Sequence, residues 1–98
     1  MMKELQQEIL DFVEKRQWSG NKDARNVAIS ISLEASELLE HFQWKNAEDA
    51  IAQRKDEIAE EAADVLIYLL QFAQILNIDL EEQARKKLLK NEQRFPVQ

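Results

Sequence analysis

Two pairs of carboxylates stand at helical spacing inside otherwise apolar stretches. Glu34 and Glu37 are three residues apart in LEASELLEHFQWK, residues 33–45, and Glu61 and Asp64 are three apart in EEAADVLIYLL, residues 60–70. Residues three apart lie on the same side of a helix. Hard cations such as Mg²⁺ bind through carboxylate oxygens together with the phosphates of a substrate. If the two helices pack side by side, the four acids predict a metal site.

The neighbours of these acids are mostly apolar. On the helix of the first pair, Glu34 borders a face made of Val27, Ala28, Ile31, Ala35, Leu38, Leu39 and Phe42. On the next helix, one stripe holds Glu57, Glu61, Asp64 and Tyr68. Two other interpretations stay open: solvated or salt-bridged acids between helices, and carboxylates that share protons. Neither stripe contains a Lys or Arg, which favours a metal ion.

The elements that must position these acids are four helices with short connections. Leu5, Ile9, Phe12 and Val13 mark an amphipathic first helix. The predicted helices run over about Lys3–Arg16, Ala24–Trp44, Ala47–Leu76 with a bend in its first part, and from the Asp79 cap to near Phe95. The stretch Trp18–Asp23, WSGNKD, is the clearest loop. We therefore predict one all-α domain over residues 1–98, four-helix bundle-like, with an antiparallel pair at its centre.

Composition bounds the function. The 98 residues carry a formal net charge of −6, which argues against a nucleic-acid polymer as partner. The absence of cysteine excludes disulfides and thiolate metal sites. The uncharged run over residues 65–78 is too short to span a membrane, and the opening MMKELQQEIL has no signal core, so we expect a cytoplasmic location and no membrane partner. A helical chain this short often shares its core with a second copy.

Two other functions compete for the same residues. A di-iron carboxylate bundle requires Glu-x-x-His motifs, whereas the only histidine, His41, has Leu38 three residues before it. The motif is therefore absent. The remaining alternative is a non-catalytic helical interaction module whose acids are only solvated.

An ordered set of motifs resembles the MazG-like all-α nucleotide pyrophosphohydrolases, most closely the small dCTP pyrophosphatase branch. Its core is Glu34-Ala-Ser-Glu37 followed after 23 residues by Glu61-Ala-Ala-Asp64, an ExxE…ExxD signature. The likeness spans about Trp18 to Pro96 and includes ARN at 24–26, FQWK at 42–45 and KLLKNEQRFP at 87–96. It implies Mg²⁺-dependent cleavage of a nucleoside triphosphate, such as dCTP or a modified pyrimidine analogue, to the monophosphate and pyrophosphate. Mn²⁺ is a possible substitute metal.

The resemblance also implies roles for single residues. The metal ligands would be Glu34, Glu37, Glu61 and Asp64, with Glu37 and Glu61 as catalytic candidates; the general base stays open. The nucleotide pocket would hold Trp18, Trp44 and Tyr68, and the phosphates or sugar would be reached by Lys87, Asn91 and Arg94. The family assembles as dimers or dimers of dimers, so a homodimer or homotetramer is expected. Asn21 and Lys22 depart from the pattern of the dCTP branch, which leaves the preferred base open.

Overall fold

The chain is described from a computed structural model, which covers residues 2–18 and 22–97. Within these residues every regular element is a helix: α1 (Met2–Lys15), α2 (Ala24–Glu40), α3 (Ala47–Leu76) and α4 (Leu80–Arg94). The predicted all-α class is therefore confirmed. Residues 19–21 of the predicted WSGNKD loop lie outside the described part of the chain.

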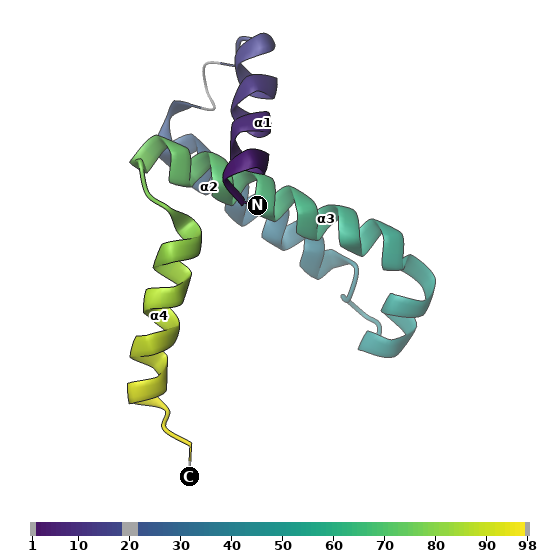
Figure 1. Cartoon of the computed structure of the whole chain (residues 1–98). Coiled ribbons are helices and arrows are strands. Elements are labelled where there is room, and N and C mark those ends of the chain that lie inside the picture. The colour runs from purple at the N-terminus through teal and green to yellow at the C-terminus, as the bar shows by residue number, and fades with distance from the viewer. Residues whose placement is uncertain (1, 19–21, 98) are drawn as a thin grey trace.

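The helices α2 and α3 form an antiparallel pair, and this pair is the centre of the fold (Figure 1). Each begins at a polar cap, as expected from the sequence. The Asp23 carboxylate accepts from the backbone N–H groups of Arg25 and Asn26, and the Asn46 side chain accepts from the N–H of Asp49 at 2.9 Å. The predicted bend in the third helix is a kink at Arg54, where φ is −135° and ψ is 30°.

The first helix packs across the second half of α3 (Figure 1). Ile9 and Val13, four residues apart on one face of α1, are buried against α3, which contributes the buried Leu70 and Ala73. The Gln6 side chain donates from Nε2 to the carbonyl oxygen of Leu70 at 2.9 Å, which anchors α1 along α3. Four of the six buried apolar residues in the described part of the chain lie at this crossing, and the other two, Val27 and Ala50, belong to α2 and the start of α3.

The fourth helix departs from the predicted bundle. Asn77 adopts a left-handed backbone (φ 55°, ψ 47°) that ends α3, and the next helix leaves at 98°. Asp79 caps α4 as predicted, accepting from the N–H of Glu82. None of the residues of α4 is buried, and the helix stands away from the others (Figure 1). Among the described residues, the extensive helix contacts are therefore those of α2 with α3 and of α1 with α3.

The second helix ends earlier than predicted. Its last helical residue is Glu40, not Trp44, and residues 41–44 form a turn in which the N–H of Phe42 bonds the carbonyl of Leu39. Trp44 has a positive φ of 67°, which the continuing helix could not accommodate. Leu39, predicted on the packing face, is mostly exposed, because the chain turns away beyond it.

Among the described residues, no single helix is both long and apolar enough to cross a membrane; α3 and α4 meet that test only as a pair bent by 98°.

Candidate active site

The antiparallel packing of α2 and α3 brings together carboxylates that are distant in the sequence. Glu34, Glu61 and Asp64 each offer one oxygen, and these three oxygens lie within 4.8 Å of one another. Glu61 and Asp64 are one turn apart on α3, and Glu34 faces them from α2. The predicted gathering of acids from two helices is thus seen in the structure for these three residues.

Two carboxyl groups of this cluster, those of Glu34 and Glu61, have a raised pKa. The pKa of Glu34 is raised from 4.5 to about 7, first by burial and then by hydrogen bonding and repulsion from Glu37, with Asp64 and Glu61 adding to it. Burial and the neighbouring Glu37 also raise the pKa of Glu61. Glu37 therefore contacts the cluster from α2, although its side chain is exposed and its oxygens are not part of the tight group. Without a counter-cation, Glu34 therefore retains its proton to higher pH than an isolated glutamate does.

Two oxygens in the cluster are buried and accept no hydrogen bond in the described part of the chain. They are Oε2 of Glu34 and Oε2 of Glu61. Each faces other carboxylates, which can only accept unless one of them carries a proton. Buried acceptors of this kind are normally partnered, and an oxygen-seeking dication satisfies several of them at once. The donor set of three or four carboxylates therefore fits a divalent metal such as Mg²⁺.

An aromatic cavity opens beside the acid cluster. It has a volume of about 410 Å³ and is lined by Glu8, Ile9, Phe12, Val13, Trp18, Asp64, Ile67, Tyr68 and Gln71. Asp64 belongs both to this lining and to the acid cluster, so the two are continuous. Trp18 packs edge-on against Phe12, with ring centroids 5.6 Å apart and an interplanar angle of 72°. We refer to this space as the aromatic cavity; two of the three aromatic residues expected at a nucleotide pocket, Trp18 and Tyr68, line it.

The other expected substrate-binding residues lie elsewhere in the chain. Trp44, in the turn between α2 and α3, is 93% exposed and is not part of the aromatic cavity lining. Lys87, Asn91 and Arg94 lie on α4, which projects away from the α2–α3 pair (Figure 1). The Arg94 guanidinium stacks over the neighbouring Phe95 ring at 5.2 Å. A single chain therefore does not bring these four residues to the acids.

Sequence reasoning missed the contribution of α1 to the cavity and the role of Gln71 in its wall. Phe12 was assigned to the packing face of the first helix, yet it is half exposed and borders the cavity. Gln71 could have been found from spacing alone, because it follows Tyr68 by three residues and so continues the stripe of Glu61 and Asp64.

Comparison with known proteins identifies the family. The model of the MazG-like family matches residues 29–98, which is most of the chain and includes both acid pairs. The chain belongs to the MazG-like family.

This MazG-like chain is 34% identical to dCTP pyrophosphatase 1 of Mus musculus over 92 residues, which cover 89% of the chain and 54% of the mouse protein. The protein of the same name from Homo sapiens is 32% identical over the same extent. The chain thus spans about half the length of the curated relatives it matches. Among solved structures, a pyrophosphatase from Archaeoglobus fulgidus is 40% identical, with a TM-score of 0.90 over 98% of this chain and 93% of the other. The helical arrangement, including the projecting α4, is therefore shared with a crystallised relative.

Proposed function

We propose that this MazG-like chain is a Mg²⁺-dependent pyrophosphohydrolase that cleaves a nucleoside triphosphate to the monophosphate and pyrophosphate. The observation that carries the proposal is the pair of buried, unpartnered carboxylate oxygens of Glu34 and Glu61, in a cluster whose third acid, Asp64, lines the aromatic cavity. Oxygen-rich acids suit Mg²⁺ and triphosphate, and aromatic rings suit a base. The relatives named dCTP pyrophosphatase favour a pyrimidine deoxynucleotide such as dCTP or a modified analogue.

The residues divide into two groups of roles. Glu34, Glu61 and Asp64, with Glu37 beside them, would hold the metal. When bound, Mg²⁺ offsets the negative charge of the triphosphate and lowers the pKa of a coordinated water. Trp18 and Tyr68 would position the base, and the phosphates would then lie over the acids. This arrangement places opposite ends of one nucleotide at the aromatic and the acidic parts of the same site.

Hydrolysis then requires one proton transfer. A water oxygen forms a bond to the α-phosphorus, and the bond from that phosphorus to the oxygen bridging it to the β-phosphorus breaks, so that pyrophosphate leaves. We assign removal of the proton from the water to Glu37, with Glu61 as the other candidate. Glu37 is the more exposed of the two and adjoins the cluster, so a carboxylate there can accept a proton and release it to solvent.

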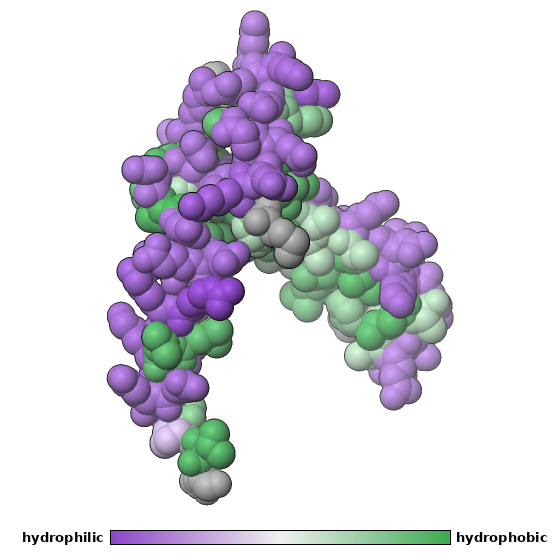
Figure 2. All heavy atoms as spheres, viewed as in Figure 1, coloured by the Kyte–Doolittle hydropathy of each residue, from purple (hydrophilic) through white to green (hydrophobic). Residues whose placement is uncertain are grey.

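The projecting helix supports a second part of the proposal, a homodimer or a dimer of dimers. The radius of gyration is 16.1 Å, whereas a compact chain of this length has about 13 Å. Leu88 and Leu89 on α4 are 65% and 62% exposed, and apolar surface is visible both on α4 and on the α2–α3 pair (Figure 2). A second copy that covers these surfaces would also offer its Trp44, Lys87, Asn91 and Arg94 to the acids of the first.

The decisive experiment is pyrophosphate release from a panel of nucleoside triphosphates with Mg²⁺. The variants are Glu37→Gln and Asp64→Asn, each expected to lower kcat/KM by at least about 100-fold. Glu60→Gln is the matched control, since Glu60 is an exposed acid next to Glu61 but outside the cluster. Release of orthophosphate instead, or full activity of both cluster variants, would contradict the proposal.

A thermal melt with and without Mg²⁺ separates this function from the alternative of a non-catalytic helical module. A metal that binds only the folded state raises Tm as its concentration rises. At a metal concentration of 100 times Kd, the free energy of unfolding increases by about 2.7 kcal/mol. The solvated acids of the alternative predict no such rise.

The assembly is tested by mixing two inactive variants. Lys87→Ala removes a cation of α4, and Glu37→Gln removes a cluster acid of α2. If α4 completes the site of the partner, mixed dimers contain one site with neither change and recover about a quarter to a half of the activity per site. If α4 serves its own chain, mixing restores nothing. Leu88→Glu with Leu89→Glu should convert the assembly to monomers in light scattering.

A further inference from the structure

Gln71 is the one polar side chain that the structure buries without a hydrogen bond outside the acid cluster, among the described residues. It is 9% exposed, and its Oε1 accepts nothing. A buried amide oxygen without a donor is unfavourable, whereas a leucine or methionine at this position of α3 would leave no polar atom unpaired. An unpartnered amide in the wall of a candidate binding cavity therefore has an explanation in a ligand.

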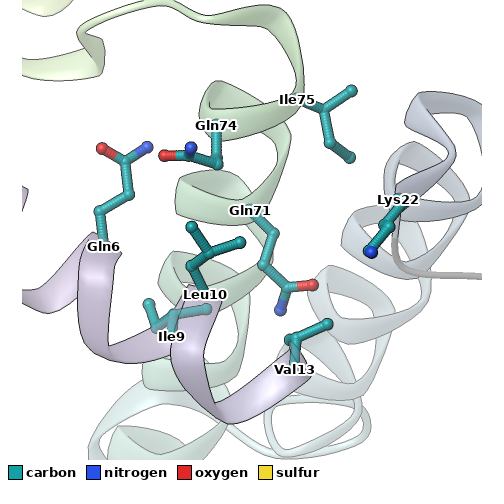
Figure 3. A pocket seen from close by; sticks show the side chains of 8 residues that line it. All are labelled: Gln6, Ile9, Leu10, Val13, Lys22, Gln71, Gln74 and Ile75. Atoms are coloured by element: carbon teal, nitrogen blue, oxygen red, sulfur yellow. The ribbon is translucent and has the colours of Figure 1, made fainter. Parts of the chain in front are cut away.

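Gln71 lies between two cavities and lines both of them. It lines the aromatic cavity of about 410 Å³ and also a smaller cavity of about 50 Å³ between α1 and α3. Figure 3 shows its side chain extending from α3 toward α1, with the amide beside Val13. Ile9 and Val13 are the other residues common to both linings, and both are apolar. We call the three shared residues, Ile9, Val13 and Gln71, the inner wall of the aromatic cavity, and Gln71 is the polar one among them.

Along one stripe of α3, an acid, an aromatic residue and an amide follow one another. Asp64, Tyr68 and Gln71 follow at intervals of four and three residues, and all three line the aromatic cavity. From Asp64 to Gln71 the helix rises by about 10 Å, which is two turns. A nucleotide whose phosphates lie at Asp64 and whose base lies against Tyr68 would direct the far edge of the base toward Gln71.

We propose that the Gln71 amide at the inner wall of the aromatic cavity reads the hydrogen-bonding edge of the substrate base and selects one with an exocyclic amino group, as cytosine has. This inference rests on the proposed function. The amide oxygen is the unpartnered acceptor, and a cytosine amino group donates to it; the amide N–H₂ can then donate to the adjacent ring nitrogen. The last side-chain torsion of Gln is broad, so the amide can turn into the cavity at little cost.

Other polar residues of the cavity are less suited to this role. Asp64 belongs to the metal cluster, and Glu8 is exposed on α1. The remaining wall is made of aromatic and aliphatic side chains. Trp18 and Tyr68 carry an indole N–H and a hydroxyl, but neither residue is buried, so leaving these groups unpaired costs less than leaving the buried Gln71 oxygen unpaired. Selection by hydrogen bonding therefore falls to Gln71, and rejection of an unsuitable base follows because the amide would stay buried and unpaired.

The experiment compares two substrates and three proteins. The substrates are dCTP and its analogue with 2-pyrimidinone as base, which lacks the amino group. The proteins are the wild type, Gln71→Met, and Gln74→Met as matched control; Gln74 lies one turn further on α3, is exposed, and is absent from the aromatic cavity lining. The wild type and the control should prefer dCTP by about 10–100-fold in kcat/KM. In Gln71→Met this preference should fall to within about threefold, because the loss of the amide weakens use of dCTP and removes the penalty on the analogue.

Stability supplies the readout that a merely structural glutamine would not give. Because the amide is buried without a partner, Gln71→Met should raise the Tm of the nucleotide-free protein, whereas a structural glutamine would make it fall. Equal use of dCTP and the analogue by the wild type, or the same preference in Gln71→Met, overturns the inference while pyrophosphate release still stands. Absence of pyrophosphate release from every nucleotide overturns the proposed function itself. If Gln71→Met does not fold, Gln71→Leu takes its place in the same two comparisons, since it also removes the amide and keeps an apolar side chain at this position.

Discussion

The metal-free protein should become less stable as pH rises through the range in which Glu34 loses its proton. Burial and the neighbouring Glu37 raise the pKa of Glu34 from 4.5 to about 7 in the folded chain. The folded state therefore binds more protons than the unfolded state between these values, and stability falls with increasing pH across this window. The contribution is fully present below pH 4.5 and lost above pH 7. Glu61, whose pKa is also raised, acts in the same direction.

The size of the effect follows from the shift. Ionising Glu34 in the folded chain should cost on the order of 1–3 kcal/mol, where the upper value takes the whole shift and the lower allows for water at the accessible part of the carboxyl group. The perturbation is Glu34→Gln, which keeps the shape of the side chain, removes the charge and provides a donor to the neighbouring carboxylates. Above the window, this variant should be more stable than the metal-free wild type by that amount, although it loses a metal ligand.

The assay is urea unfolding followed by circular dichroism, in the presence of a chelator and at fixed protein concentration, at pH values on both sides of the window. Protein concentration is fixed because assembly would contribute to stability. Glu60→Gln is the control, since it removes an exposed acid outside the cluster and should keep the wild-type pH slope. The reasoning is refuted if the metal-free wild type keeps constant stability across the window, or if Glu34→Gln shows an equal slope. Addition of Mg²⁺ above the window should stabilise the wild type and leave Glu34→Gln nearly unchanged.

Three further predictions concern the frame that holds the site, each measured by urea unfolding with Mg²⁺ absent. Leu70→Ala should cost about 2–5 kcal/mol, because Leu70 is 1% exposed at the crossing of α1 and α3. Asn77→Val should cost about 1–2 kcal/mol, since a β-branched residue is unfavourable at φ 55°; Asn77→Gly should be neutral, and equal stability of both variants would contradict this account. Asp79→Ala should lower the free energy of unfolding by about 1 kcal/mol, because the hydrogen bond from the N–H of Glu82 is lost. Asp79→Asn should keep most of that stability, because its side-chain oxygen can accept the same bond.

Much of the local structure follows from short-range chemistry and could be predicted. Asp23, Asn46 and Asp79 accept from N–H groups of the helices that begin after them, and Asp and Asn are among the preferred residues at this position. The placement of Glu61 and Asp64 on one face of α3 was predictable as well from helical periodicity, whereas their meeting with Glu34 depended on the packing of α2 against α3. The early end of α2 could not be predicted, since the positive φ of Trp44 serves the α2–α3 turn and leaves no mark in an otherwise helical pattern.

Periodicity states which residues share a face of one helix but is silent on which helices meet. The sequence alone determined four helices, their caps and two acid-bearing stripes. Only the tertiary structure decided that α1 closes a cavity beside Asp64, that Gln71 lies unpartnered in its wall, and that α4 stands apart with Lys87 and Asn91. The reason is that helix propensity and capping act over a few residues, whereas crossing angles and burial depend on how whole faces of side chains pack.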